Sequence, residues 1–270
     1  IQNMLNIEPD DSVNALLRLR GLNDEEFVKS HYVVFATKNG TVKKTSLEAY
    51  SRPRTNGVNA INIVEGDEVV DVRLTNGKNE IILANRNGRA VRFDEDSIRT
   101  MGRVSTGVRG MKLDDGDDQV VGMIVVNNAE TETVMVVSEN GYGKRSQVED
   151  YRKTNRGGKG VKTFSITEKT GRLVAIKNVT DDNDLMIINK SGIAIRLAVS
   201  ECRVMGRATQ GVRLINLSKK NDVIASVCKV MSTEKEAEVS GDKDDENATP
   251  ATDVQATEAP QTETQTTETE

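Results

Sequence analysis

Positively charged side chains recur at fixed places in a sequence unit of about fifty residues. Each unit is marked by a glycine, at Gly40, Gly88, Gly141 and Gly192. The fourth residue after each glycine is a cation, namely Lys44, Arg92, Arg145 and Arg196. Lys and Arg neutralise the phosphates of nucleic acids and release their counterions, with no need to read the bases. Cations that keep the same phase in every unit therefore predict a repeated surface that binds a long, regular polyanion.

Further cations are spaced around a second glycine in each unit, at Gly57, Gly107, Gly160 and Gly211. In the last three units one arginine stands eight residues before it, at Arg99, Arg152 and Arg203. Another stands four residues before it, at Arg103, Arg156 and Arg207, and a cation stands two after it, at Arg109, Lys162 and Arg213. The first unit has Asn59 at that last position. To the predicted phosphate-binding set we add neighbouring cations, namely Lys43, Arg52, Arg54, Arg89, Lys144, Lys153 and Lys159. We expect the cations four residues after the first glycine to face solvent.

Each unit opens with an apolar run that predicts a buried strand, at 32–37, 80–85, 133–138 and 184–189. Asn-Gly or Ser-Gly follows, and Asn-Gly predicts a two-residue type I′ hairpin turn. A return strand comes next, then β-patterned runs on both sides of an Asp, Gly or Asn-rich loop. Four strands per unit at this spacing indicate an all-β protein of blades around an axis. We expect helix only as single turns, within 47–52 and 148–154.

The repeats divide the chain into a folded part and a tail. Residues 31–231 form four complete units, at 31–79, 80–132, 133–183 and 184–231, and residues 1–30 are similar to the back half of a preceding unit. The 37 basic and 42 acidic residues are unevenly spread, since residues 232–270 hold twelve acidic and two basic ones. This leaves 35 basic and 30 acidic residues in 1–231. We expect 232–270 to be a disordered acidic tail, because from residue 249 onward it has almost no large apolar residue. It is either a solubilising extension or a competitor of the polyanion.

Other kinds of chemistry find no support in the sequence. His31 is the single histidine, so no histidine-based triad can form, and Cys202 and Cys228 have no metal-ligand spacing. The sequence contains no run of eighteen apolar residues, so it predicts no membrane-spanning helix. The glycine-rich segment 156–160 lacks the spacing of a nucleotide-binding loop, and we expect Arg156 and Lys159 to contact phosphate there. The chain has four Phe, four Tyr and no Trp, which favours duplex over single-stranded nucleic acid.

Several motifs together resemble the C-terminal domain of the A subunit of bacterial DNA gyrase, a type IIA topoisomerase. They are HYVVFATKNGTVKKTSLEAY, NGVNAINIVEGDEVVDV, AVRFDEDSIRTMG, STGVRGMKL, ENGYGKRSQVEDY and MGRATQGVRLI, in order over residues 1–231. The resemblance implies a β-pinwheel, a propeller-like wheel whose neighbouring four-stranded blades exchange strands. The family's Q-R-R-G-G-K-G box belongs to its first blade, which is expected upstream of residue 1. The nearest match here, TNRGGKG at 154–160, lies in a later unit and lacks the leading Gln-Arg.

The resemblance also implies a function and partners. Double-stranded DNA bends around the basic rim, and the ATP-dependent holoenzyme thereby introduces negative supercoils. The partners are the gyrase B protein and the rest of the gyrase A protein, in an A2B2 heterotetramer of the bacterial cytoplasm. This chain is then a non-catalytic part of an enzyme that uses ATP and Mg²⁺ elsewhere, and it binds no cofactor itself. Two alternatives are the equivalent domain of topoisomerase IV, which favours decatenation, and a protein-interaction propeller.

Overall fold

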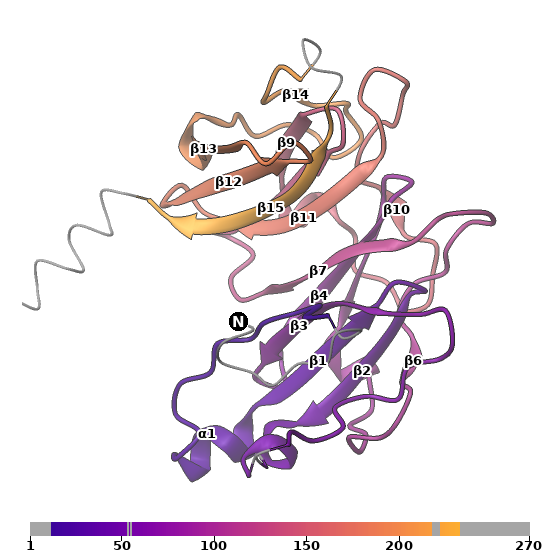
Figure 1. The fold of residues 1–270 in the computed structure, drawn as a ribbon, viewed down its shortest axis with the longest axis vertical. Helices are drawn as coiled ribbons and strands as arrows, with labels where there is room; N and C mark the ends of the chain where they lie inside the picture. The colour runs from indigo at the N-terminus through magenta and orange to yellow at the C-terminus, as the bar shows by residue number, and fades with distance from the viewer. Residues whose placement is uncertain (1–11, 53, 55, 218–221, 233–270) are drawn as a thin grey trace, which may run out of the picture. The chain divides into compact units, whose positions relative to one another are not determined.

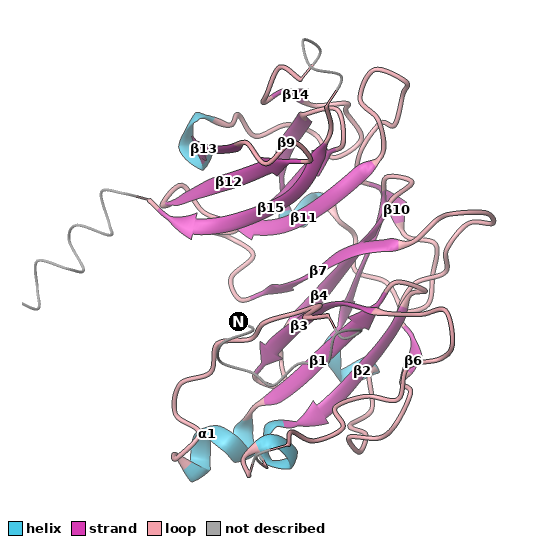
Figure 2. Cartoon of the chain, viewed as in Figure 1, coloured by secondary structure: helices cyan, strands magenta, loops and turns pink. Residues whose placement is uncertain are grey.

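The structure is a computed structural model that describes residues 12–52, 54, 56–217 and 222–232. The described chain is almost entirely β, and its strands form four sheets, one for each sequence unit (Figures 1 and 2). The expectation of an all-β, propeller-like protein built from four blades is confirmed.

Each blade is built on one antiparallel hairpin. The four hairpins are β1 (Tyr32–Thr37) with β2 (Thr41–Ser46), β4 (Glu80–Asn85) with β5 (Arg89–Asp94), β8 (Thr133–Ser138) with β9 (Tyr142–Gln147), and β12 (Asn183–Asn189) with β13 (Ala194–Ala198). A longer strand pairs with the first strand of each hairpin: β3 (Val69–Thr75), β7 (Val120–Val126), β11 (Leu173–Val179) and β15 (Ile224–Met231). These four strands lie next to one another in that order, so β7 separates β3 from β11.

The hairpin loops hold three residues, one more than the sequence predicts. In the first blade β1 ends at Thr37 and β2 begins at Thr41, which leaves residues 38–40 in the loop, and the Gly40 amide donates to the Thr37 carbonyl at 3.0 Å. Gly40 thus follows the turn in the left-handed region, at φ +84°, where glycine has no steric penalty. The other three blades have the same register, so the prediction of two-residue turns is wrong. An Asn-Gly pair fits a three-residue loop with left-handed glycine as well as a type I′ turn.

The blades exchange strands, as the resemblance implies. Three two-residue strands, β6 (Val108–Arg109), β10 (Val161–Lys162) and β14 (Val212–Arg213), each pair with the hairpin of the preceding blade. The fourth strand of a blade therefore belongs to the next sequence unit, not to its own. A second contact accompanies the exchange, because the hairpin glycine packs against a backbone carbonyl of the next unit. A Cβ on Gly40, Gly88 or Gly141 would lie 2.7 Å from that carbonyl oxygen.

Three of the four hydrophobic clusters lie between neighbouring blades, and the fourth joins the first blade to the residues before it. Ile81 and Leu83 on β4 face a cluster shared with the first blade, whereas Ile82 and Ala84 face a cluster shared with the third. Strand β8 divides its residues in the same way between the second and fourth blades. A strand that is covered on both faces needs no polar residues in alternation, which explains the continuous apolar runs.

Short helical turns connect the blades. The predicted single turns appear as η1 (Leu47–Tyr50) and η3 (Val148–Asp150), and equivalent turns appear at η2 (Glu95–Ser97) and η4 (Val199–Glu201). One helix was not foreseen: α1 (Glu25–Ser30), which Asp24 caps by accepting from the Glu26 and Phe27 amides. The expected disordered tail, 232–270, lies outside the described residues except for Ser232.

Among the described residues, the two ends of the repeat array differ from its middle. Among the described residues the fourth sheet has three strands, in the order β13-β12-β15, and Ile193 and Ile195 remain 40% and 36% exposed. At the other end, residues 56–62 correspond to β6 in sequence position but form no strand. Residues 12–20 also form no strand, although Leu17 and Leu19 pack against the first blade.

Candidate nucleic-acid interface

The cations four residues after the hairpin glycines do not form a solvent-facing row. Lys44, Arg92 and Arg145 are only 5%, 6% and 9% exposed, so the expectation of exposure is wrong for three of the four. The next unit in the sequence covers them, since it crosses the hairpin and bonds to it. The fourth cation, Arg196, is exposed, and no further unit covers it in the described chain. It still pairs with Asp184 at 2.7 Å.

Arg92 shows what these buried cations do. Its Nε lies 2.6 Å from a carboxylate oxygen of Glu80 in the same blade. Its Nη1 donates to the carbonyls of Val148 and Tyr151 in the next unit, both at 3.0 Å. Burial acts to raise the pKa of Glu80, but hydrogen bonds from Arg92 and Lys153 outweigh it and hold the pKa below its ordinary value. Arg92 therefore joins two blades.

Lys44 and Arg145 make related contacts. Lys44 Nζ lies 3.5 Å from Glu95, which is fully buried in η2 of the next unit, and 3.2 Å from the Glu95 carbonyl. Arg145 Nη1 lies 2.6 Å from Asp181. Lys43 and Lys144 precede these cations and are 0% and 1% exposed, so their predicted contact with phosphate is contradicted by burial as well.

Most of the other predicted cations lie at the surface. Within the described part of the chain, eleven are exposed or half-exposed and have no carboxylate within ion-pair distance: Arg52, Arg54, Arg99, Arg103, Arg109, Arg152, Arg156, Lys162, Arg203, Arg207 and Arg213. Four are accessible but paired with acids: Arg89, Lys153, Lys159 and Arg196. The unpaired cations are thus concentrated in the segments around the second glycines, which we call the rim segments (residues 51–62, 99–112, 152–165 and 203–216).

Backbone hydrogen bonds connect each rim segment to the next. The amides of Asn62, Lys112 and Ser165 donate to carbonyls one unit further along, at Ser105, Gly158 and Thr209. Side chains repeat the connection: Arg156 donates to the carbonyls of Ser97 and Arg109, and Arg207 donates to those of Asp150 and Lys162. The arginine four residues before a second glycine therefore lies beside the cation two residues after the previous one. The rim cations consequently form one series that crosses the blade boundaries.

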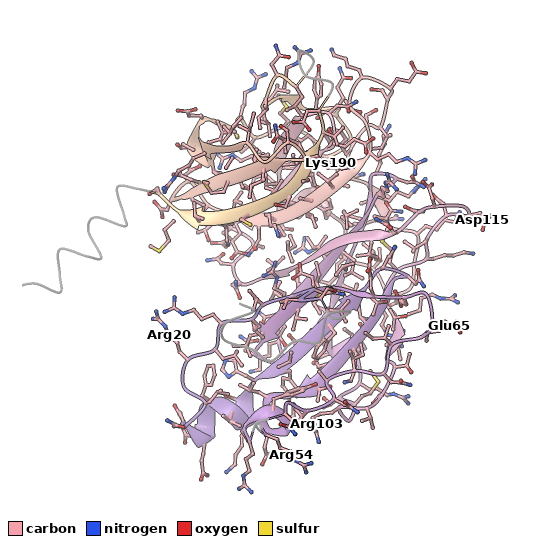
Figure 3. All side chains as sticks on the ribbon, in the orientation of Figure 1. Arg20, Arg54, Glu65, Arg103, Asp115 and Lys190 are labelled. Atoms are coloured by element: carbon pink, nitrogen blue, oxygen red, sulfur yellow. The ribbon has the colours of Figure 1, made fainter. Side chains whose placement is uncertain are left out.

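Hollows lie between the rim cations. One, of about 690 Å³, is lined by Arg52, Arg54 and Arg103, and another, of about 540 Å³, by Arg152, Arg156 and the glycine-rich loop. Figure 3 shows Arg54 and Arg103 close together on this surface. The glycine-rich loop keeps Gly157 and Gly160 at positive φ, so its shape depends on glycine. Closely spaced guanidinium groups with free N–H donors suit phosphate oxygens.

The sequence interpretation missed one exposed rim cation. Lys112 is exposed on the segment that bonds to Gly158, yet its counterparts in the other units are Asn62, Ser165 and Asn216. Because its charge does not recur, the repeat pattern gave no signal for it. The described residues include no cluster of acids, His and Cys able to hold a metal ion. No helix in the same part of the structure is long and apolar enough to cross a membrane.

The exchanged strands, the interblade cores and the cationic rim define a strand-exchanged β-propeller. A family model described as the DNA gyrase C-terminal domain, beta-propeller, matches residues 31–76, 79–127, 132–180 and 183–228. The chain belongs to this family of DNA gyrase C-terminal domains.

Individual relatives agree with that membership. The chain is 43% identical over 230 residues to the DNA gyrase A proteins of Staphylococcus epidermidis and of Staphylococcus aureus strain MRSA252. Each match covers 85% of this chain and 25% of the relative, so the chain spans about a quarter of the relatives' length.

Two solved structures are similar in fold. The C-terminal domain of DNA topoisomerase IV has a TM-score of 0.77 at 28% identity and covers 89% of this chain and 74% of that one. A DNA gyrase A C-terminal domain has a TM-score of 0.74 at 23% identity, with 85% and 74% covered.

Proposed function

We propose that this chain binds duplex DNA along its rim segments and bends it, as the wrapping domain of a DNA gyrase A protein. The observation that carries the proposal is the series of eleven accessible cations without carboxylate partners, on rim segments that bond to one another across the blades. A cation without a carboxylate partner is free to replace the counterions of a phosphate. Recurrence at the same places in successive blades suits a partner whose charges also repeat regularly, as the phosphates of a nucleic-acid backbone do.

Bending is within reach of such a surface. Smoothly bending 20–30 base pairs through 40–90° costs on the order of 1–6 kcal/mol. Each rim segment after the first offers three predicted contact positions, represented in the third unit by Arg152, Arg156 and Lys162. A few phosphate contacts per blade offset a cost of this size, and they do so without base contacts.

In the whole enzyme, we propose that the wrapped DNA is passed to a cleavage core outside this chain. That core, with the gyrase B protein in an A2B2 assembly of the bacterial cytoplasm, would use ATP and Mg²⁺ to introduce negative supercoils. Gyrase is preferred to topoisomerase IV because the 43% identity to gyrase A proteins extends over 230 residues. The similarity to the topoisomerase IV domain, at 28% identity, keeps decatenation as the second candidate.

The test compares two triple variants in the full chain. Arg99→Ala/Arg152→Ala/Arg203→Ala removes one exposed cation from each of three rim segments. Lys38→Ala/Lys78→Ala/Lys190→Ala removes the same charge from loops outside the rim. Binding to a plain duplex is measured against salt concentration, and bending is measured by DNA circularisation.

The rim variant should make the negative slope of log K against log salt shallower by about 3, and it should reduce DNA circularisation. The loop variant should change both much less. Equal effects of the two variants, or no duplex binding by the unmodified chain, would refute the proposed function.

A further inference from the structure

Lys43 and Lys144 occupy equivalent places, three residues after the hairpin glycines of the first and third blades. Both side chains are almost fully buried, at 0% and 1% exposure. Within the described residues neither has a carboxylate within ion-pair distance. A buried ammonium without a counterion is costly, so its hydrogen bonds decide whether it is tolerated.

Those hydrogen bonds go to the rim. Lys43 Nζ donates to the carbonyls of Ala60 and Arg103, and its ammonium lies 5.2 Å from the centre of the Phe35 ring. Lys144 Nζ donates to the Gly206 carbonyl at 2.8 Å and to Ser146 Oγ at 3.0 Å. Both lysines therefore hold the rim segment of the next unit, at or beside the arginine four residues before its second glycine.

The second blade lacks this contact, which provides an internal comparison. Its equivalent residue is Val91, and the rim arginine facing it, Arg156, is held by carbonyls of Ser97 and Arg109 instead. Arg207 has both kinds of support, because Lys144 bonds to the adjacent Gly206 carbonyl and Arg207 itself donates to the backbone carbonyls of Asp150 and Lys162. For Arg103, no hydrogen bond of its side chain to another described residue replaces the lysine contact.

We propose that Lys43 and Lys144 are positioning residues for DNA binding: from inside their blades they hold the rim segments that present Arg103 and Arg207 to the phosphates. The proposal rests on the proposed function, because it assigns the rim arginines to DNA. The lysines themselves touch no phosphate. Each lysine acts through a backbone carbonyl of the next unit and thereby fixes the position of the nearby arginine. Because both side chains are positively charged, the lysine also repels that arginine.

That repulsion makes the arrangement sensitive to pH. Burial lowers the pKa of Lys43 to about 8, and the Arg103 charge adds to the effect. Burial likewise lowers the pKa of Lys144 to about 8, with Asp150 opposing and Arg207 reinforcing the shift. Among the described residues, other polar groups near these lysines are the hydroxyl of Tyr50, which shares the Ala60 carbonyl, and that of Ser146, beside the Tyr151 hydroxyl. A phosphate that neutralises the arginine raises the lysine pKa, so DNA binding takes up protons near pH 8.

The experiment uses the full chain with Lys43→Met and Lys144→Met, singly and together. Val134→Ala, in the core of the third blade, is the control for general loss of stability. Amide hydrogen exchange without DNA should become roughly tenfold faster at Ser105 and Met205 in the double variant, because each loop loses a charge-assisted hydrogen bond. Exchange at Thr154, in the rim segment opposite Val91, should not change.

Affinity for a plain 40-base-pair duplex is then measured from pH 7 to 9.5. The unmodified chain should bind severalfold more weakly as pH rises through 8, whereas the double variant should bind more weakly at pH 7 and show a flatter profile. Unchanged exchange at Ser105 and Met205, or a pH profile that survives in the double variant, overturns the proposal. Absence of duplex binding at any pH overturns the proposed function instead, and the exchange rates still decide what the lysines hold.

Discussion

Replacing Arg92 by alanine should destabilise the protein far more than replacing the neighbouring rim residue Arg152. The Arg92 side chain is 6% exposed, and its loss leaves Glu80 with one cation and the carbonyls of Val148 and Tyr151 without their donor. Removing one partner of a buried pair costs about 3–5 kcal/mol. Because Lys153 stays 2.6 Å from Glu80, we expect the lower end, about 3 kcal/mol.

Urea unfolding measures this difference directly. At a slope of about 3 kcal/mol per M, the Arg92→Ala midpoint should fall by about 1 M. Arg152→Ala, at an exposed position, should change the stability by less than about 0.5 kcal/mol but lower the salt slope of DNA binding by about 1. Arg92→Met with Glu80→Leu should recover part of the loss, since no buried charge is then left unpaired. Equal midpoints for Arg92→Ala and Arg152→Ala would refute the assignment of Arg92 to the blade interface.

Three further outcomes follow from the same structure. Gly160→Ala should cost at least about 2 kcal/mol in thermal unfolding, because its Cβ would lie 2.2 Å from the Ala90 carbonyl, whereas Gly57→Ala, at a similar φ but with no atom within 4 Å, should cost less. Tyr151→Phe should cost about 1 kcal/mol through the lost 2.6 Å hydrogen bond to Thr163. Burial raises the pKa of Tyr151 to about 12, so the tyrosine's contribution is present below about pH 10 and lost as pH rises through 12, and Tyr151→Phe should remove this loss. Deleting residues 232–270, which hold twelve acidic and two basic residues, should tighten duplex binding at low salt; unchanged affinity would leave the tail as a solubilising extension.

The hairpins could be predicted from the sequence because their signal is local. Each apolar run is followed by a glycine that must take positive φ, and the structure has all four hairpins where the pattern put them. The exchange of the short strands was implied only by the family resemblance. Two-residue segments such as Val108–Arg109 contain no periodicity that identifies their partner.

The recurrence of the cations was visible in the sequence, but their environment was not. A repeated position indicates a repeated surrounding, which is either solvent or an identical buried contact. Arg92 and Arg196 each have a carboxylate twelve residues earlier, at Glu80 and Asp184, and this pairing was an available sign of a structural role. Lys44 and Arg145 lack that sign, because their acidic partners Glu95 and Asp181 lie in later parts of the sequence.

The origin of the two-residue strands constrains how such arrays gain or lose repeats. A cut between sequence units never coincides with a cut between sheets, so excising one unit removes a strand from the blade before it. The join also brings a foreign strand onto that blade. A duplicated or deleted unit is tolerated only if its Gly-Val-Arg/Lys segment can pair with the hairpin that it newly meets. The register permits this, because the valine of this segment pairs with equivalent hairpin residues in three blades, Val42, Ala90 and Gly143. Because the three joints share this register, one could replace another without changing the backbone pairing at the boundary between blades.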